Sequence, residues 1–210
     1  NMTLAYLGAI ILFFGWFGFN GGSTLEATPA IAPIIMNTII AACFGCLAAS
    51  TLSWSQSEFK RPEGEMIMNG VLAGLVSITA GCASVTPVGA ACIGLIGGVI
   101  VYYSTRILER TLKLDDVVSA IPVHGVAGAW GTIAVGIFIT PEQLGDTPRL
   151  TQIGIQALGV LAAFLWAFGG GFLALKIIDT FIPLRVSPEG ERIGLNVAEH
   201  GATSGVVDLA

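Results

Sequence analysis

Charged residues are scarce in this sequence, and their scarcity excludes whole classes of protein. Asp, Glu, Lys and Arg make up 11% of the 210 residues, whereas a typical soluble domain carries about 25%. Stretches without any charged residue occupy 1–25, 27–57, 66–105, 117–141 and 150–175. Each can cross a hydrocarbon core of roughly 30 Å, which takes about 20 apolar residues. The sequence therefore excludes a soluble domain, a disordered chain and a nucleic-acid-binding protein, and it predicts an all-α polytopic membrane protein.

Reactive chemistry is also scarce. The chain has no paired nucleophile and base and no phosphate-binding loop, so we expect neither an enzyme nor a cofactor. Its first apolar stretch lacks the basic lead-in and cleavage site of a signal peptide. Cys43 and Cys46 have the spacing of a redox or metal dithiol, but no second cluster or polar ligand accompanies them. Buried, inert thiols are the favoured interpretation.

The apolar stretches predict six membrane spans. The stretch 66–105 is too long for one helix, and Pro87 with its flanking glycines favours a turn inside it. We expect residues 1–182 to form the membrane bundle and residues 183–210 to form a tail or connector. The predicted spans are 4–22, 30–53, 67–82, 88–107, 117–139 and 152–178.

Lys and Arg residues orient these spans, because cytoplasmic loops are enriched in positive charge. Arg149 lies alone in one of the loops on the opposite side. The bias predicts a protein of the cell membrane with both ends of this chain in the cytoplasm. The other eight of the nine basic residues share one side: Lys60, Arg61, Arg106, Arg110, Lys113, Lys176, Arg185 and Arg192.

Glycine is abundant, with 28 residues. In membrane helices glycine lets neighbouring helices approach closely, often through pairs spaced by four positions. A tightly packed bundle of this kind is typical of a channel or transporter with a narrow path. The sets that fit such faces are Gly70 with Gly74, Gly94 with Gly98, and Gly125 with Gly128 and Gly131.

His124 is the titratable residue that stands out inside the predicted spans. It lies ~10 Å into the span 117–139 at about 1.5 Å per residue, near mid-membrane depth. Its helical neighbours are mainly small, so we expect a buried imidazole that packs against another helix or lines a thin lumen. A pore or proton-handling role is favoured over a structural histidine that bridges helices. Without a carboxylate or thiolate nearby, we expect no metal site.

A second candidate site lies at the outer end of the first span. Trp16, Phe19 and Ser23 share one helical face at i, i+3 and i+7. An aromatic ring beside a hydroxyl can hold a small cation, because the ring face attracts the charge and the oxygen accepts an N–H bond. An interfacial aromatic belt, with Ser23 capping the helix end, accounts for the same residues equally well.

Three motifs resemble the ammonium transporter (Amt/Mep/Rh) family, and its Amt branch in particular. The resemblance covers nearly the whole chain. The motifs are Gly15-Trp16-Phe17-Gly18-Phe19-Asn20-x-Gly22-Ser23, then Asp115-Asp116 followed by Pro122-Val123-His124-Gly125-Val126-x-Gly128, and the tail Gly194-Leu195-Asn196-Val197-Ala198-Glu199-His200-Gly201.

The resemblance implies a fold of eleven helices, made of two inverted five-helix repeats and a long last helix, in a homotrimer with one pore per subunit. The six predicted spans would be helices six to eleven. Ser23, with Trp16 and Phe19, would recruit ammonium at the outer mouth. Phe19 would be one of two stacked gate phenylalanines, and His124 the second of twin pore histidines. The implied activity is ammonium transport or ammonia conduction.

The resemblance also implies partners outside this sequence. Helices one to five, with the first histidine and the other gate phenylalanine, would come from the same or another chain. The tail motif Glu199-His200-Gly201 would pack under the bundle and couple subunits, although His200 on its own fits an exposed surface histidine. Residues 202–210 resemble a connector into a downstream domain, which keeps an ammonium sensor joined to a kinase or cyclase as the alternative to a transporter. A PII-class signalling protein is a further expected partner.

Asp115 and Asp116 precede the fifth predicted span. Carboxylates at this position accept hydrogen bonds from free N–H groups and favour the positive end of a helix. We therefore expect helix caps here.

Overall fold

The computed structural model describes residues 2–201, and in this range the chain consists of helices and loops without a strand. Internal contacts divide it into two compact units, Asn1–Val160 and Leu161–Ala210, which are described separately. The expected connector at 202–210 lies outside the described residues.

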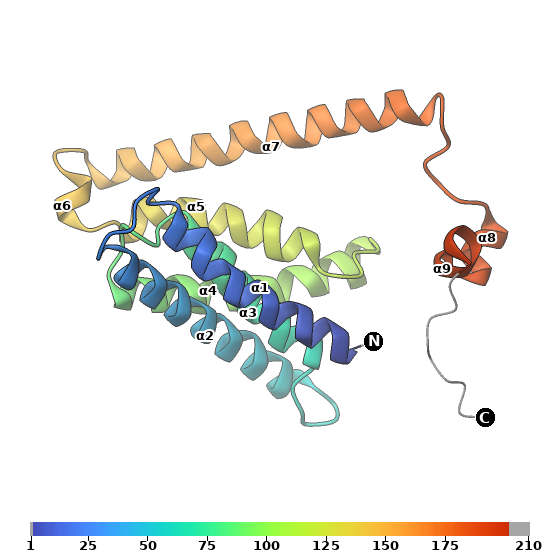
Figure 1. Cartoon of the computed structure of the whole chain (residues 1–210), viewed down its shortest axis with the longest axis horizontal. Coiled ribbons are helices and arrows are strands. Elements are labelled where there is room, and N and C mark those ends of the chain that lie inside the picture. Colours follow the sequence, from blue (N-terminus) through green and yellow to red (C-terminus); the bar gives the residue numbers. More distant parts are fainter. Residues whose placement is uncertain (1, 202–210) are drawn as a thin grey trace. The chain divides into compact units, whose positions relative to one another are not determined.

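The first unit holds most of the helices, and α1 and α2 run antiparallel in it (Figure 1). The second unit holds the rest of α7, α8 (Pro188–Ile193) and α9 (Leu195–His200). The elements of the first unit are α1 (Met2–Gly22), α2 (Ile31–Gln56), α3 (Gly64–Thr79), α4 (Pro87–Arg106), the π-helices η1 (Ile107–Leu112) and η2 (Ile121–Val126), α5 (Ala127–Phe138), α6 (Pro141–Leu144) and the start of α7 (Arg149–Asp179).

Within residues 2–201, five helices are long and apolar enough to cross a membrane. They are α1, α2, the run Pro87–Leu112, the run Ile121–Phe138 and α7. The sixth, α3, is a shorter apolar helix of 16 residues. Each predicted span overlaps one of these helices, and the all-α membrane fold expected from the charge-free stretches is confirmed.

The fifth predicted span starts in the wrong place. Residues 113–119 form a loop in which Ser119 has φ 53°, and residues 121–126 form the π-helix η2 instead of an α-helix. The side chain of Asp116 explains where the helix begins, because its carboxylate accepts hydrogen bonds from the N–H groups of Ala120 and Ile121, both at 2.8 Å. His124 therefore lies in the first turn of η2 and not two turns into a long α-helix.

The glycine pairs of α3 and α4 both face the backbone of α2. The carbonyl of Gly45 lies against Gly70 of α3 and Gly98 of α4. One turn earlier, the carbonyl of Ala41 contacts the other member of each pair in the same way. A side chain at any of these glycines would overlap backbone atoms, so the three helices meet main chain to main chain. The predicted glycine faces of α3 and α4 are thus confirmed as helix contacts.

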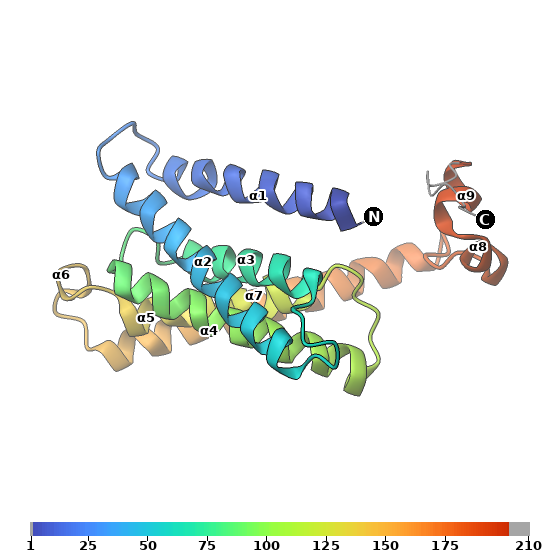
Figure 2. The same ribbon diagram turned by 90° about the horizontal axis from the view of Figure 1, so that it is seen from below.

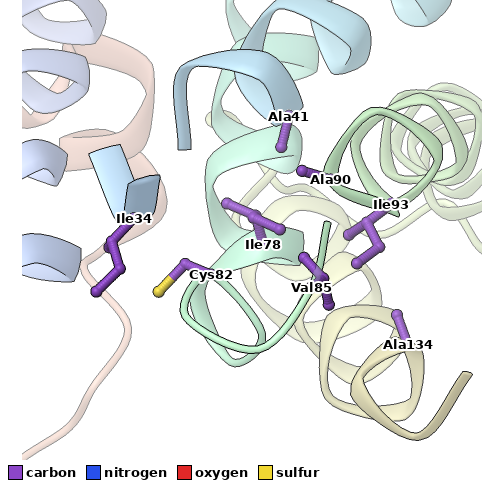
Figure 3. Close-up of a cluster of buried hydrophobic side chains, with 8 residues drawn as sticks. All are labelled: Ile34, Ala41, Ile78, Cys82, Val85, Ala90, Ile93 and Ala134. Atoms are coloured by element: carbon purple, nitrogen blue, oxygen red, sulfur yellow. The ribbon is translucent and has the colours of Figure 1, made fainter. Parts of the chain in front are cut away.

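Small and branched apolar side chains extend this junction toward the loop between α3 and α4 (Figure 3). Ile78 is fully buried at its centre. The loop ends at Pro87, the first residue of α4, where the Thr86 side chain caps the helix by accepting the N–H of Gly89 at 3.2 Å. The cluster consists of Ile34, Ala41, Ile78, Cys82, Val85, Ala90, Ile93 and Ala134.

Helix α5 packs on α3 through one member of the third glycine set, Gly131, whereas Gly128 makes an ordinary contact with the Val76 side chain and Gly125 has only Ile121 of its own helical segment nearby. Gly131 lies against the backbone of Ser77, and the Ser77 hydroxyl donates to the Ala127 carbonyl at 3.2 Å. On the other side of α5, the Trp130 indole donates to the carbonyl of Ile93 on α4 at 3.1 Å. These contacts fix η2, which leads directly into α5, relative to α3.

Arg149 closes the C-terminal end of α5. Its guanidinium donates to the carbonyls of Gly136, Ile137 and Ile139 at 3.2, 2.6 and 3.1 Å. Helix ends leave such carbonyls without partners, and a cation there also favours the negative end of the helix dipole. Arg149, which lies apart from the other eight basic residues, thus stabilises the end of a helix.

Helix α1 contacts the rest of the first unit through few side chains, and Figure 2 shows it beside α2 and α3. Among its residues only Asn20 and Gly21 are buried. The Asn20 amide donates to the Thr38 hydroxyl on α2 at 3.0 Å. At the opposite end, the Tyr6 hydroxyl lies over Gly64 at the start of α3.

Candidate functional site

A groove of about 610 Å³ lies between α1, α3 and η2. It contains three residues singled out from the sequence: Trp16, Phe19 and His124. Its remaining walls are almost entirely apolar, so a polar ligand in it meets few hydrogen-bonding groups besides the imidazole and the Thr79 hydroxyl. The full lining is Ile11, Leu12, Gly15, Trp16, Phe19, Val76, Thr79 and His124.

His124 is exposed on this groove. The expectation of a buried imidazole is therefore not met within this chain, where His124 lines a groove, and its place in a thin lumen stays a prediction. The reason is local: the π-helix begins at Ile121, and the buried side chains of Pro122 and Val123 occupy the packed face. π-helical turns of this kind are frequent at functional sites.

Trp16 is held in a fixed orientation by α3. Its indole N–H donates to the Thr79 hydroxyl at 2.8 Å, and that hydroxyl donates to the Leu75 carbonyl at 2.7 Å. The Trp16 ring meets the Phe19 ring edge to face, with 5.6 Å between centroids. The rings of α1 therefore have a defined position relative to α3, across the groove.

Ser23 lies just beyond the end of α1 and does not line the groove. Its hydroxyl donates to the Phe19 carbonyl at 2.7 Å. Since the single proton is engaged, the Ser23 oxygen has only lone pairs left and can act as an acceptor. Ser23 can therefore cap the end of α1 and still accept a hydrogen bond from a cation, so the two roles considered for it from the sequence are compatible.

Buried amides and hydroxyls on α2 were not identified from the sequence. The Asn37 amide of α2 donates to the carbonyls of Cys82 and Val85, both at 2.9 Å, and so holds the loop between α3 and α4. Thr38 donates to the Ile34 carbonyl at 2.8 Å while it accepts from Asn20. The sequence did offer a sign of these hydrogen bonds, because Asn37 and Thr38 are uncharged polar residues inside the charge-free stretch 27–57.

The remaining candidates lie elsewhere in the two units. Asp116 has the hydrogen bonds of a helix cap, whereas Asp115 is exposed. In the second unit, Glu199 and His200 are exposed in the last turn of α9. Gly201 ends this helix with φ 59° and donates its N–H to the Val197 carbonyl at 3.1 Å.

The cysteines differ from one another in burial. Cys82 is buried, Cys46 and Cys92 are partly buried, and Cys43 is exposed. The expectation of buried thiols is therefore wrong for Cys43, because its position on α2 faces an apolar groove of about 470 Å³ instead of a helix contact.

These features define a polytopic helical membrane protein with an apolar, histidine-containing groove along one side. The sequence profile of the Ammonium Transporter Family matches residues 1–204. The chain belongs to the ammonium transporter family, and the resemblance seen in the three motifs is confirmed.

Curated relatives agree with this assignment. The ammonium transporter Amt2 of Archaeoglobus fulgidus is 43% identical over 216 residues, which cover 97% of this chain and 46% of that protein. The ammonium transporter of Bacillus subtilis is 32% identical over 210 residues, which cover 96% of this chain and 51% of that protein. The chain thus spans about half the length of the curated relatives it matches.

Solved structures give the same picture. A structure described as a sensor Amt protein matches with a TM-score of 0.90 and 47% identity, covering 95% of this chain and 49% of that one. Mep2 of Saccharomyces cerevisiae matches with a TM-score of 0.82 and 28% identity, covering 90% and 45%. The helices described here therefore correspond to half of an Amt/Mep fold.

Proposed function

We propose that this chain supplies half of the wall of an ammonium-conducting pore, in a homotrimer whose first five helices come from the same or another chain. The observation that carries this proposal is the groove in which Trp16, Phe19 and His124 come together. The names of the curated relatives supply the substrate, ammonium. We also propose that both ends of the chain lie in the cytoplasm, as its basic residues indicate.

The residues divide the task by their chemistry. The aromatic face of Trp16 attracts a cation, and the Ser23 oxygen accepts one of its N–H bonds. The apolar walls of the groove penalise an ion that keeps its charge and its hydration shell. Ammonium can lose a proton, and potassium cannot. The His124 imidazole can hydrogen-bond ammonia or pass on a proton.

Ammonium-driven current in liposomes that hold the complete protein tests this proposal. We expect a current that falls at least tenfold in Phe19→Ala and His124→Ala, in line with the loss of one positioned group at a site. Phe14→Ala is a matched control, since Phe14 lies on the same helix, is exposed and does not line the groove. Full current in both site variants would overturn the assigned residues.

A second candidate function is ammonium sensing through the tail. The observation that favours it is the likeness to the structure described as a sensor Amt protein. In a sensor, bound ammonium must have different affinities for two conformations of the tail. The partner would be a fused kinase or cyclase, or a PII-class signalling protein bound to the segment around Glu199, His200 and Gly201.

The same liposomes separate the two functions. Measurable ammonium binding without current in the intact protein would reject conduction and support sensing. A stop codon soon after Ala210 in the gene would reject a fused signalling domain. An ammonium-driven current in the liposomes, together with such a stop codon, would support the transporter and reject the fused sensor.

A further inference from the structure

Ser119 lies where the loop 113–119 passes into η2, the π-helix that carries His124. It is 1% exposed and has φ 53°, a backbone angle that is uncommon for a residue with a side chain. Its N–H donates to the Asp116 carbonyl at 3.0 Å, and its own carbonyl accepts the N–H of Val123 at 3.0 Å. Because Val123 directly precedes His124, the conformation of Ser119 sets where the first turn of η2 begins and how its side chains are directed.

A carboxylate of α3 holds Ser119 from the side. The Ser119 hydroxyl donates to Oε1 of Glu65 at 3.3 Å. Glu65 lies in the first turn of α3 and is half-buried. Within residues 2–201, no Lys or Arg forms an ion pair with it. The Ser119 hydroxyl is therefore the polar side chain that the described part of the chain offers to this carboxylate.

Helix α3 thus grips η2 at both of its ends. At the start, Glu65 accepts the hydroxyl of Ser119. At the other end, the Ser77 hydroxyl donates to the carbonyl of Ala127, the residue that follows η2, at 3.2 Å. The same helix supplies Val76 and Thr79 to the groove that His124 lines. The imidazole and the wall beside it are therefore held by one rigid element.

Glu63 shows that the neighbouring carboxylate has a different task. It precedes α3 and pairs with Arg106, the last residue of α4, at 2.5 and 2.6 Å. This ion pair is separated from η2 by the whole segment 107–118. Two carboxylates at one end of α3 therefore hold the two ends of that segment, and only Glu65 contacts the side that leads to His124.

We propose that Glu65 is a positioning residue for His124. Its carboxylate holds Ser119 in the conformation from which η2 starts, and this directs the imidazole into the groove. The inference rests on the proposed role of His124 in conduction. A small displacement of a functional group lowers a rate steeply, by as much as a hundredfold for about 1 Å, so the contact should matter for activity although Glu65 does not line the groove.

Hydrogen–deuterium exchange of the complete protein, together with ammonium-driven current in liposomes, tests the proposal. In Glu65→Leu and in Ser119→Ala, the amides within 119–126 should exchange at least tenfold faster, because a hydrogen bond to a charged acceptor is lost. The current should fall at least fivefold, while exchange in α2 stays unchanged. Glu65→Gln keeps an acceptor oxygen and should retain both slow exchange and current.

Glu63→Leu is the matched control, which should leave exchange within 119–126 unchanged. The double variant Glu65→Leu/Ser119→Ala should equal either single variant, because both changes remove the same hydrogen bond. Additive losses would overturn the proposal, as would unchanged exchange in both single variants, an equal effect of Glu63→Leu, or fast exchange with full current. A wild-type protein without current would overturn the proposed function alone, since exchange around His124 still tests whether Glu65 holds it.

Discussion

Replacing Gly98 by alanine should destabilise the protein, because the added methyl group has no room between α2 and α4. A Cβ at this position would lie 2.9 Å from the Ala48 Cβ and 3.0 Å from the Gly45 carbonyl carbon. Carbon atoms in comfortable contact lie about 3.5–4.0 Å apart. The shortfall is therefore more than half an ångström, and it is set partly by backbone, which cannot rotate away.

The size of the effect follows from two opposing terms. Overpacking of this kind costs about 1–3 kcal/mol, and the rigid backbone contact places Gly98→Ala near the upper value. Alanine recovers about 0.5–1 kcal/mol, because glycine loses more conformational freedom in a helix. We expect a net loss of about 2 kcal/mol in the free energy of unfolding.

Gly89→Ala on the same helix is the matched control. A Cβ there would have its nearest neighbours at 3.4–3.5 Å, in ordinary contact. This variant should be stabilised by about 0.5–1 kcal/mol. Unfolding of the complete protein in mixed detergent and SDS micelles, followed by circular dichroism, measures the difference between the two. Equal stability of the two variants would refute the main-chain packing of α2 against α4.

Three further substitutions test single contacts by the same unfolding measurement. Thr79→Val leaves the Trp16 indole N–H without its acceptor and should lower the free energy of unfolding by about 1–3 kcal/mol. Thr79→Ser keeps the hydroxyl and should retain most of that stability. Equal losses in the two variants would contradict the hydrogen bond between Trp16 and Thr79. Asp116→Ala removes two backbone hydrogen bonds at the start of η2 and should cost about 0.5–2 kcal/mol. Glu63→Gln breaks the ion pair with Arg106, whose side chains are 40% and 22% exposed, and should cost under about 1 kcal/mol because solvent screens the pair. This last loss should shrink further at high salt, and a loss that grows with salt would contradict an ionic origin.

Much of the fold could be predicted from the sequence, because the relevant physics is local. A charge-free stretch of sufficient length must bury itself in a membrane, and Pro87 with its glycines must interrupt the helix between 66 and 105. The glycine faces of α3 and α4 were visible as pairs spaced by four, although their common partner, the carbonyls of Gly45 and Ala41, depends on how three helices align. The relative alignment of neighbouring helices cannot be predicted from a single sequence.

The groove was predicted less completely. Motif resemblance pointed to Trp16, Phe19 and His124, and the structure brings all three together. The role of Thr79 as acceptor for Trp16 was missed, because a hydroxyl in an apolar stretch can equally bond its own helix. The helix start at Ile121 was missed as well, although Pro122 in the first turn of η2 is a typical sign of a helix start.

The C-terminal end of α5 determines which charges a cation meets when it approaches this part of the first unit. Arg149 gives three N–H groups to carbonyls of its own chain, and the negative helix end beneath it offsets part of its charge. The neighbouring carboxylates of Glu142 and Asp146 are exposed. A cation that approaches this loop therefore meets two exposed carboxylates and an arginine whose guanidinium is engaged by the backbone.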